Sequence, residues 1–511
     1  MTVRRRDFLG HLAAGSAVVS MPAFLQGCGS LFVNDPAGKP PANPFLEWFG
    51  IDDAMASRVL SALAKNGADA AELYFQYRQS SDLVMEEGVI THSATDVIQG
   101  VGLRVVMGGQ MGFAFTDDLA LPGMLAAASR AATIAGGSEQ IAPQAFAPSP
   151  AGNLYRTEVS WADVQLDRKL PLLQRAERAA RAADPAVARV TVNWHDSDER
   201  VLIMTLDGRM ITDARPMTRL SVQPVAKRGT AAYSGFASIA AREGIGWYTD
   251  QRIDRVAQTA VDRTLLLFDA RRPPSGDMPV ILAAGAGGIL LHEAIGHAFE
   301  ADFSRDGVSP YGGATGQKVA EPIITIVDDA TIPGARGALN YDDEGTAGSR
   351  TVVVENGILR TCLHDAMTAQ HYGTGTTGSA RRESYRFAPM PRMTCTYIED
   401  GPHERDEVIA AVSRGIIAET FTDVRVSPGG GDFMLHVRNG WMVENGKVTA
   451  PIRDVDISGN GPETLRRMTM AANDSALDRG GWMCGKKGQQ VPVSQGMPTV
   501  LVSGMMVNVR G

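Results

Sequence analysis

The residues of this chain that could do chemistry are concentrated in one passage, His292-Glu293-Ala294-Ile295-Gly296-His297. A carboxylate next to two imidazoles is typical of a metal site with its own base, as in the H-E-x-x-H pattern of zinc peptidases. Here the histidines are five residues apart instead of four. At about 100° per residue, that spacing separates the two side chains by roughly 140° on a regular α-helix. The passage therefore predicts a helix that is broken or widened, with Gly296 as the residue where the backbone yields most easily.

The residues around this passage favour a metal over a chance grouping of surface or core side chains. Leu290, Leu291, Ile295 and Phe299 make the segment apolar. Burying two histidines and a glutamate in such a helix is costly unless something pairs them. A divalent cation is the simplest partner.

A catalytic zinc usually has three protein ligands and leaves a fourth position for water. Glu300 and Asp302 lie nearby in the sequence and are candidates for the third ligand. Cys484 is a softer candidate, because its flanking glycines allow close approach of the backbone and the lysines that follow it favour a thiolate. A buried structural cysteine is the alternative reading of Cys484.

The part of the chain before residue 275 alternates helical and strand-like patterns, which predicts an α/β or α+β region at 46–275. We expect helices at 53–65, 119–135, 161–183 and 253–268. We expect strands at 71–77, 83–91, 100–115, 188–194, 201–206 and 220–227.

From residue 276 to 511 the pattern becomes β-rich. Asn-Gly pairs at 356–357, 439–440 and 445–446 each stand between strand-like runs, which is a strong hairpin signal. Three hairpins predict a meander or barrel, with the Cys484 segment as a loop over it. The overall prediction is an α+β protein with an N-terminal α/β domain and a β-rich, barrel-like C-terminal domain that carries the metal-site helix.

The N-terminus resembles an export signal. Arg4-Arg5-Arg6-Asp7-Phe8-Leu9, followed by an apolar run to Leu25, is similar to a twin-arginine signal at 1–28. The run is too short and interrupted for a membrane span. Leu25-Gln26-Gly27-Cys28 is similar to a lipoprotein cleavage box, with Cys28 as the residue that would be lipidated. The proline-rich stretch 29–45 then reads as a linker. We therefore expect export to the periplasm, and a cytosolic protein with a basic terminus is the alternative. For Cys28 we expect lipidation, and an unmodified cysteine of the signal peptide is the alternative.

Composition limits the class of partner. The 511 residues are 44% hydrophobic and 21% charged, as in a soluble globular protein, and the net charge of -8 argues against nucleic acid. Besides Cys28 and Cys484 there are only Cys362 and Cys395, which would either pair with each other or be unrelated thiols.

Several motifs together resemble the TldD/TldE (PmbA) family of metallopeptidases, on the TldD side that keeps the metal motif. The resemblance extends over roughly residues 45 to 508. The matching motifs are His292-Glu-Ala-Ile-Gly-His297-Ala-Phe-Glu300-Ala-Asp302-Phe303, Val354 to Leu359, Arg381-Arg382-Glu383-Ser384-Tyr385, Pro391 to Thr394, Ser458 to Glu463, and Cys484-Gly485-Lys486 with Gly488-Gln489. One departure is Cys395, where the family pattern leads us to expect asparagine.

The resemblance implies one Zn²⁺ per chain, held by His292, His297 and Cys484, with Glu293 as the general base. It also implies a peptide or unfolded polypeptide substrate and a dimer, either with a second copy or with a related TldE-type chain. In this reading Glu300 and Asp302 orient the histidine rings. Candidates for the oxyanion donor remain open: His364, His371, Tyr385, Arg381 and Arg382. The alternative function is a non-catalytic peptide-binding or modulator subunit with a structural zinc.

Overall fold

The computed structural model describes residues 43–134, 140–155, 157–427 and 430–510. The predicted export signal, Cys28 and nearly all of the predicted linker lie outside these ranges. Within the described residues, no helix combines the length and the apolar character that crossing a membrane requires.

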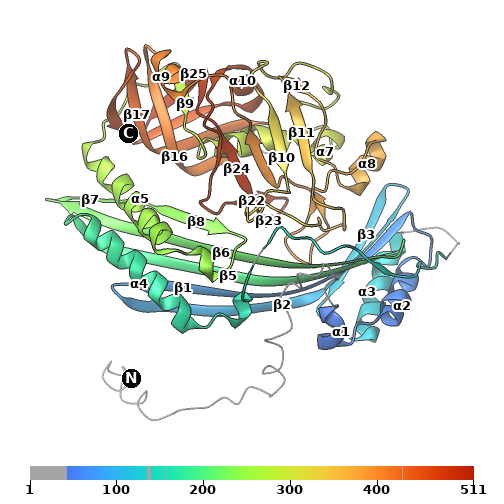
Figure 1. Ribbon diagram of the computed structural model, residues 1–511. Coiled ribbons are helices and arrows are strands. Elements are labelled where there is room, and N and C mark those ends of the chain that lie inside the picture. The colour runs from blue at the N-terminus through green and yellow to red at the C-terminus, as the bar shows by residue number, and fades with distance from the viewer. Residues whose placement is uncertain (1–42, 135–139, 156, 428–429, 511) are drawn as a thin grey trace, which may run out of the picture. The chain divides into compact units, whose positions relative to one another are not determined.

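The first part of the described chain forms one long sheet flanked by two groups of helices (Figure 1). The strand order is β3-β2-β1-β5-β6, all antiparallel, with β7 and β8 also pairing with β6 and the short β4 parallel to it. The strands are β1 (Ala70–Glu86), β2 (Val89–Met107), β3 (Gln110–Thr116), β4 (Ala147–Pro148), β5 (Val187–Thr205), β6 (Arg209–Arg228), β7 (Ala231–Ser234) and β8 (Ala237–Ala241).

Each group of helices encloses its own hydrophobic core against this sheet. The first group buries Phe75 and Leu103, and the second buries Val192 and Leu220. The first group is α1 (Pro44–Phe49), α2 (Asp53–Leu63) and α3 (Leu121–Ala131), and the second is α4 (Leu166–Ala183) and α5 (Asp250–Asp269). Short 3-10 turns are η2 (Ala132–Ile134), η3 (Trp161–Asp163) and η4 (Ile245–Trp247). The sequence left open whether this region is α/β or α+β. Because its long strands are antiparallel, it is α+β.

The predicted strands were correct in type but wrong at several boundaries. The predicted strand 83–91 contains a turn at Glu87 and Gly88, which both have positive φ and separate β1 from β2. Conversely, the predicted strands 188–194 and 201–206 are one continuous strand, β5. Nearly its whole length pairs with β6 on one side and most of it with β1 on the other, so the strand continues through the polar residues at 195–200.

The C-terminal part contains a closed barrel of five strands. They are β9 (Gly276–Leu282), β16 (Arg414–Val426), β17 (Asp432–Glu444), β19 (Val455–Asn460) and β25 (Val500–Val509). The order β16-β9-β25-β19-β17 closes because β17 also pairs with β16. β18 (Lys447–Ile452) and β20 (Met468–Ala471) extend it. The predicted α+β class with a barrel-like C-terminal part is confirmed.

A second sheet lies beside the barrel and shares its core. Its strands, in spatial order, are β12 (Ile358–Leu359), β11 (Arg350–Glu355), β10 (Ile326–Asp329), β15 (Cys395–Ile398), β24 (Ser494–Met497) and β21 (Ala476–Leu477). The passage 288–299 packs in the core that includes Val280 of the barrel and Ile326 of this sheet. Two strand pairs complete the β structure: β13 (Ala380–Arg381) with β14 (Met390–Pro391), and β22 (Met483–Lys486) with β23 (Gln489–Pro492). The remaining helices are α7 (Ala301–Arg305), α8 (Ala366–Tyr372), α9 (Arg405–Ala410) and α10 (Gly461–Arg466).

Two of the three Asn-Gly pairs form the predicted hairpins. Asn356-Gly357 and Asn445-Gly446 have positive φ at both residues and connect β11 to β12 and β17 to β18. Asn439-Gly440 does not: it lies inside β17, and this prediction was wrong. The side chain of Asn439 accepts from Thr420 Oγ1 at 2.8 Å, and a Cβ on Gly440 would lie 2.3 Å from the carbonyl oxygen of Ile417. This glycine is required by close strand packing rather than by a turn.

Strand pairing changes between β8 and β9, since β9 to β25 pair only among themselves within the described residues. The division at 275 itself remains a prediction. Cys362 and Cys395 are both free thiols, so they do not form the disulfide that was one of the two alternatives.

Candidate metal centre

The predicted wide turn is present in the passage that carries the two histidines. After α6 (Gly288–Leu290), residues Leu291–Ile295 form a π-helical turn, η5, and Gly296–Phe299 form a 3-10 turn, η6. The Gly296 N–H donates to the carbonyl oxygen of Leu291, five residues earlier. This wider turn aligns side chains five residues apart, so both imidazoles face the same side of the helix.

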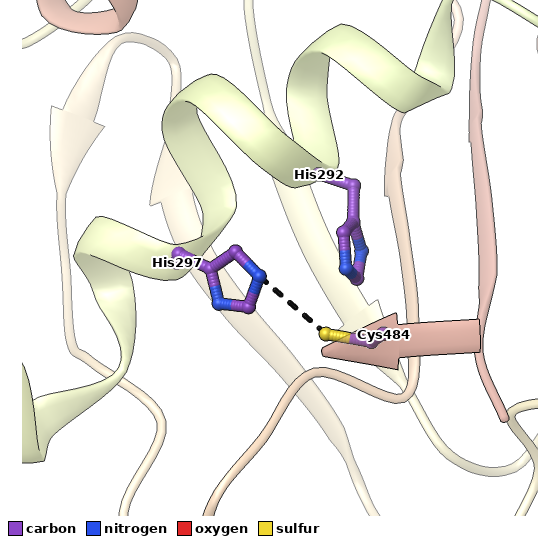
Figure 2. A group of neighbouring side chains, drawn as sticks. All are labelled: His292, His297 and Cys484. Carbon is purple, nitrogen blue, oxygen red and sulfur yellow. Dashed lines mark hydrogen bonds between the residues drawn. The ribbon is translucent and has the colours of Figure 1, made fainter. Parts of the chain in front are cut away.

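The third side chain of the cluster comes from β22. Figure 2 shows the rings of His292 and His297 beside the thiol of Cys484. The Cys484 Sγ lies 3.4 Å from Nε2 of His297, and one ligand atom from each of the three residues lies within 4.8 Å of the others. All three residues are at most 1% exposed. The expected juxtaposition is therefore present, but Cys484 lies on a short strand rather than on the predicted loop.

The electrostatics of the cluster favour a thiolate. Burial by itself raises the pKa of the Cys484 thiol, but the rings of His292 and His297 outweigh it and hold that pKa well below its ordinary value. Neither ring nitrogen of His292 has a hydrogen-bond partner of good geometry, although both are buried. Buried polar atoms without a partner are rare and need an explanation, such as a bound ion.

Glu300 orients one of the rings, as the sequence predicted. Its Oε2 lies 2.8 Å from Nδ1 of His297, which directs the other ring nitrogen, Nε2, toward the thiol. Lys486 Nζ contacts the same carboxylate oxygen at 2.9 Å. Burial opposes ionisation of Glu300, but Lys486 and the His297 ring hold the pKa of its carboxyl well below its ordinary value. A carboxylate in this position makes the His297 ring a better ligand.

Asp302 does not contact a histidine, so this part of the prediction was wrong. Its carboxylate pairs instead with Lys486 Nζ at 2.6 Å and with Lys487 Nζ at 3.1 Å. Both lysines therefore neutralise carboxylates, and the lowered pKa of the Cys484 thiol has the histidine rings as its cause. Asp302 therefore affects His297 only indirectly, because it positions Lys486, which contacts Glu300.

Glu293 is the most accessible polar side chain of the passage. It is 19% exposed, and its Oε2 lies 3.9 Å from Nε2 of His297. A carboxylate that borders the cluster and still reaches solvent can exchange a proton with a water molecule.

Sequence reasoning missed a row of buried polar residues beneath His292. The register of β10, β15 and β24 places three of them side by side: Asp328, Thr396 and Gln495. Each lies two residues from an apolar neighbour that packs in the core with the metal-site helix: Ile326, Ile398 and Met497. Alternate strand residues share a face, so the polar row faces the same helix.

Several polar side-chain atoms of this row have no hydrogen-bond partner. The amide oxygen and nitrogen of Gln495 and the hydroxyl of Thr396 are buried without a hydrogen bond. Burial raises the pKa of the Asp328 carboxyl to about 6, although hydrogen bonds from Thr394 oppose the rise. No spacing in the sequence indicated these residues, because they come together only through the pairing of remote strands.

The candidates for an oxyanion donor are all in contact with other groups. Arg381 donates to the carbonyl oxygens of Met393 and Pro492, and Arg382 pairs with Glu72. The Tyr385 ring packs against Phe115. His364, which precedes α8, and His371, in its last turn, both pack against Tyr372. Arg392, which sequence reasoning missed, donates to the carbonyl oxygen of Cys484 itself. It lies in the matched motif Pro391 to Thr394, which was the available signal.

Comparison with known proteins shows the family to which the chain belongs. Three domain models of the PmbA/TldA metallopeptidase family match the chain: domain 1 at residues 71–135, the central domain at 160–268 and the C-terminal domain at 275–509. The chain belongs to the PmbA/TldD family of metallopeptidases. Its match to the C-terminal domain contains the whole cluster of His292, His297 and Cys484.

Relatives within the PmbA/TldD family are similar over most of their length. A metalloprotease TldD homolog from Haemophilus influenzae is 36% identical over 456 residues, covering 88% of this chain and 95% of the relative. A zinc metalloprotease TldD homolog from Saccharolobus solfataricus is 28% identical, covering 67% and 76%. The fold resembles that of TldE from Thermococcus kodakarensis, with a TM-score of 0.70 at 17% identity over 89% of this chain and 99% of the other. It also resembles a Thermotoga maritima protein described as a modulator of a DNA gyrase, with a TM-score of 0.68 at 23% identity over 89% and 100%.

The residues of this PmbA/TldD member fit a zinc ion. Two imidazoles and a thiolate are a borderline-soft donor set that suits zinc better than magnesium or calcium. Tetrahedral zinc with bonds of about 2.0 to 2.3 Å holds its ligand atoms roughly 3.3 to 3.8 Å apart, and the Cys484 Sγ to His297 Nε2 distance of 3.4 Å lies in that range. An ion would also give the unpartnered His292 ring the contact that it lacks.

Replacing Glu300 with Gln is expected to weaken zinc binding by about 10- to 100-fold, because the neutral amide orients His297 less firmly and lowers its basicity. Competition with a chromogenic chelator measures the zinc Kd. Glu321→Gln is the matched control, since Glu321 makes only an exposed pair with Lys318. Melting of the zinc-free proteins reports separately on the fold. An unchanged zinc Kd in a folded Glu300→Gln protein would remove the orienting role.

Proposed function

We propose that this chain is a zinc-dependent peptidase that hydrolyses peptides or unfolded polypeptide segments. One Zn²⁺ per chain is held by His292, His297 and Cys484, and Glu293 is the general base. The main support for this proposal is that the Cys484 thiol lies close to two histidines that precede it by up to 192 residues. In addition, both ring nitrogens of His292 are buried without a hydrogen-bond partner.

The chemistry divides between the ion and the protein. When bound, zinc supplies Lewis-acid chemistry, which polarises a carbonyl group and makes water more acidic. Glu293 accepts the proton of the attacking water and delivers it to the nitrogen of the departing amine, as its partly exposed position allows. Glu300 keeps the His297 ring in one orientation throughout.

Burial of the cluster supports a flexible substrate. The three proposed ligands are at most 1% exposed, so a folded protein surface cannot approach them. An extended peptide segment is narrower than a folded protein, so its backbone reaches such a site more easily. The family membership supports a substrate with peptide bonds, since the relatives are named metalloproteases.

Removal and return of zinc tests this function. We expect a chelator to abolish cleavage of a quenched fluorescent peptide by the purified protein, and stoichiometric zinc to restore it. The melting temperature is recorded in parallel, because a bound ion also stabilises the folded state. If zinc raises the melting temperature but no peptide is cleaved at any zinc level, the chain is instead a peptide-binding or modulator subunit with a structural zinc.

The proposal extends to partners and location. We propose a dimer, either with a second copy or with a TldE-type chain, which the fold similarity to TldE supports. We also propose export by the twin-arginine route to the periplasm, supported by Arg4-Arg5-Arg6 and the apolar run that follows, and lipid anchoring through Cys28, supported by Leu25-Gln26-Gly27-Cys28. Fractionation of cells that express the chain with and without Arg5→Lys and Arg6→Lys tests the route, and the same location for both would contradict it.

A further inference from the structure

A cavity rich in arginine lies next to β22, the strand that supplies Cys484. It has a volume of about 120 Å³, enough for a few water molecules or a small polar group. Strands β1, β5 and β6 contribute to one side, and the β22–β23 hairpin contributes Met483 and Pro492 to the other. The lining includes six arginines: Arg78, Arg215, Arg242, Arg336, Arg381 and Arg382. It includes only three carboxylates: Glu199, Asp343 and Glu383.

These carboxylates already have partners of their own. Asp343 binds Arg215 Nη1 at 2.6 Å and also accepts the backbone N–H of Arg382. Glu383 accepts the backbone N–H of Gln490 at 2.7 Å, and Glu199 accepts from the side chain of Gln76. Within the described residues, none of these three carboxylates forms an ion pair with Arg242, Arg336 or Arg381.

Three of the arginines, Arg242, Arg336 and Arg381, are buried and make no ion pair with any described carboxylate. They are 3%, 8% and 3% exposed. Arg242 and Arg381 donate to backbone carbonyl oxygens, and Arg336 donates to the carbonyl oxygen of Trp482 and to Met483 Sδ. Buried cations without a counter-charge are costly, so this arrangement needs a reason.

Arg336 is the clearest sign of a missing anion. Its Nη1 is buried with no hydrogen-bond partner. Burial, together with the neighbouring charges of Arg219 and Arg242, lowers the pKa of the Arg336 guanidinium to about 9. An anion in the cavity would satisfy the free N–H group and offset the repulsion among the arginines.

We propose that this cavity binds a carboxylate group of the peptide substrate. The inference rests on the proposed peptidase function and deepens it. The planar fork of a guanidinium matches a carboxylate in a bidentate manner, and three converging arginines favour it over a neutral amide. Met483 lines the cavity while Cys484, the next residue, faces the histidines, so the carboxylate would be held on the other side of the strand that supplies the thiol.

Two parts of a peptide carry a carboxylate: its C-terminus and an acidic side chain. Four N-terminally labelled hexapeptides separate them. The first has no charge and a C-terminal amide, and the second is its free acid. The third and fourth are amides with one internal Glu or Gln. Fluorescence anisotropy measures their Kd for the full zinc-loaded chain with Glu293→Gln, which binds peptide without cleaving it. The ionic strength is kept near physiological, so that unspecific attraction is screened.

We expect at least one carboxylate peptide to bind about tenfold or more tightly than its neutral counterpart. Arg336→Met should abolish this preference without changing the Kd of the neutral amide, which also shows that the variant is folded. Arg405→Met, on the exposed first turn of α9, should leave the preference intact. Arg242→Met is the second test if Arg336→Met does not fold.

Each outcome has a distinct meaning. Preference for the free acid assigns the cavity to the substrate C-terminus, and preference for the Glu peptide assigns it to an acidic side chain. Equal binding of all four peptides overturns the carboxylate site but leaves the peptidase intact, provided that the wild-type chain cleaves them. If no peptide binds and none is cleaved, both proposals fail.

Discussion

Glu293→Gln is expected to lower kcat/KM for peptide hydrolysis by about 10²- to 10⁴-fold while zinc remains at one ion per chain. The amide has the size of the carboxylate but cannot accept the proton of the attacking water. Glu293 lies outside the group of ligand atoms that converge, and its side chain is 19% exposed, so the substitution leaves the cluster and the core in place. Steady-state cleavage of a quenched peptide and metal analysis of the same sample measure the two quantities.

The matched control for this substitution is Glu355→Gln. Glu355 lies on β11, is half exposed and pairs only with Arg360, so we expect unchanged activity and zinc content. Wild-type cleavage by Glu293→Gln would show that another group is the base. Loss of zinc together with activity would show instead that Glu293 belongs to the metal ligands.

Cys484→Ala is expected to have the second large effect, a loss of zinc. A carboxylate that only orients a ligand contributes about 10- to 100-fold to affinity, so loss of a ligand should exceed about 100-fold. The purified variant should carry little zinc after dialysis against a chelator, and peptide cleavage should disappear with it. Metal analysis and a zinc titration check this prediction.

Cys362→Ala is the control, because Cys362 is a free, half-buried thiol outside the cluster. It should keep stoichiometric zinc and activity. Full zinc occupancy in a folded Cys484→Ala protein would contradict the three-ligand site and leave the two histidines to be explained otherwise. Circular dichroism of the zinc-free variant separates metal loss from unfolding.

Much of the local structure followed from residue spacing. The separation of five positions between His292 and His297 required a wider turn for the two rings to face the same way, and the π-turn at Leu291–Ile295 provides it. Asn356-Gly357 and Asn445-Gly446 form hairpins because both residues of each pair adopt positive φ. These predictions concern neighbours along the chain, where backbone geometry leaves few choices.

Two predictions were wrong because they depended on tertiary contacts that the local sequence does not show. Asn439-Gly440 has the same two residue types as the other pairs, yet it lies in β17, which pairs with β16 on one side and β19 on the other. Asp302 is close to His297 in sequence, but lysines from the β22–β23 hairpin occupy its carboxylate. In both cases a tertiary partner outweighed a local preference.

By itself, then, the sequence determined which residue types on the helix could bind a metal, the need for a distorted turn and the α+β class, since each depends on residue types at short separation. Only the tertiary structure determined how closely Cys484 approaches the two rings, that Glu300 and not Asp302 orients His297, and that three unpaired arginines share one cavity. The reason is physical: side chains nearly two hundred residues apart meet through the closure and packing of sheets, and no short-range pattern encodes the distance between them.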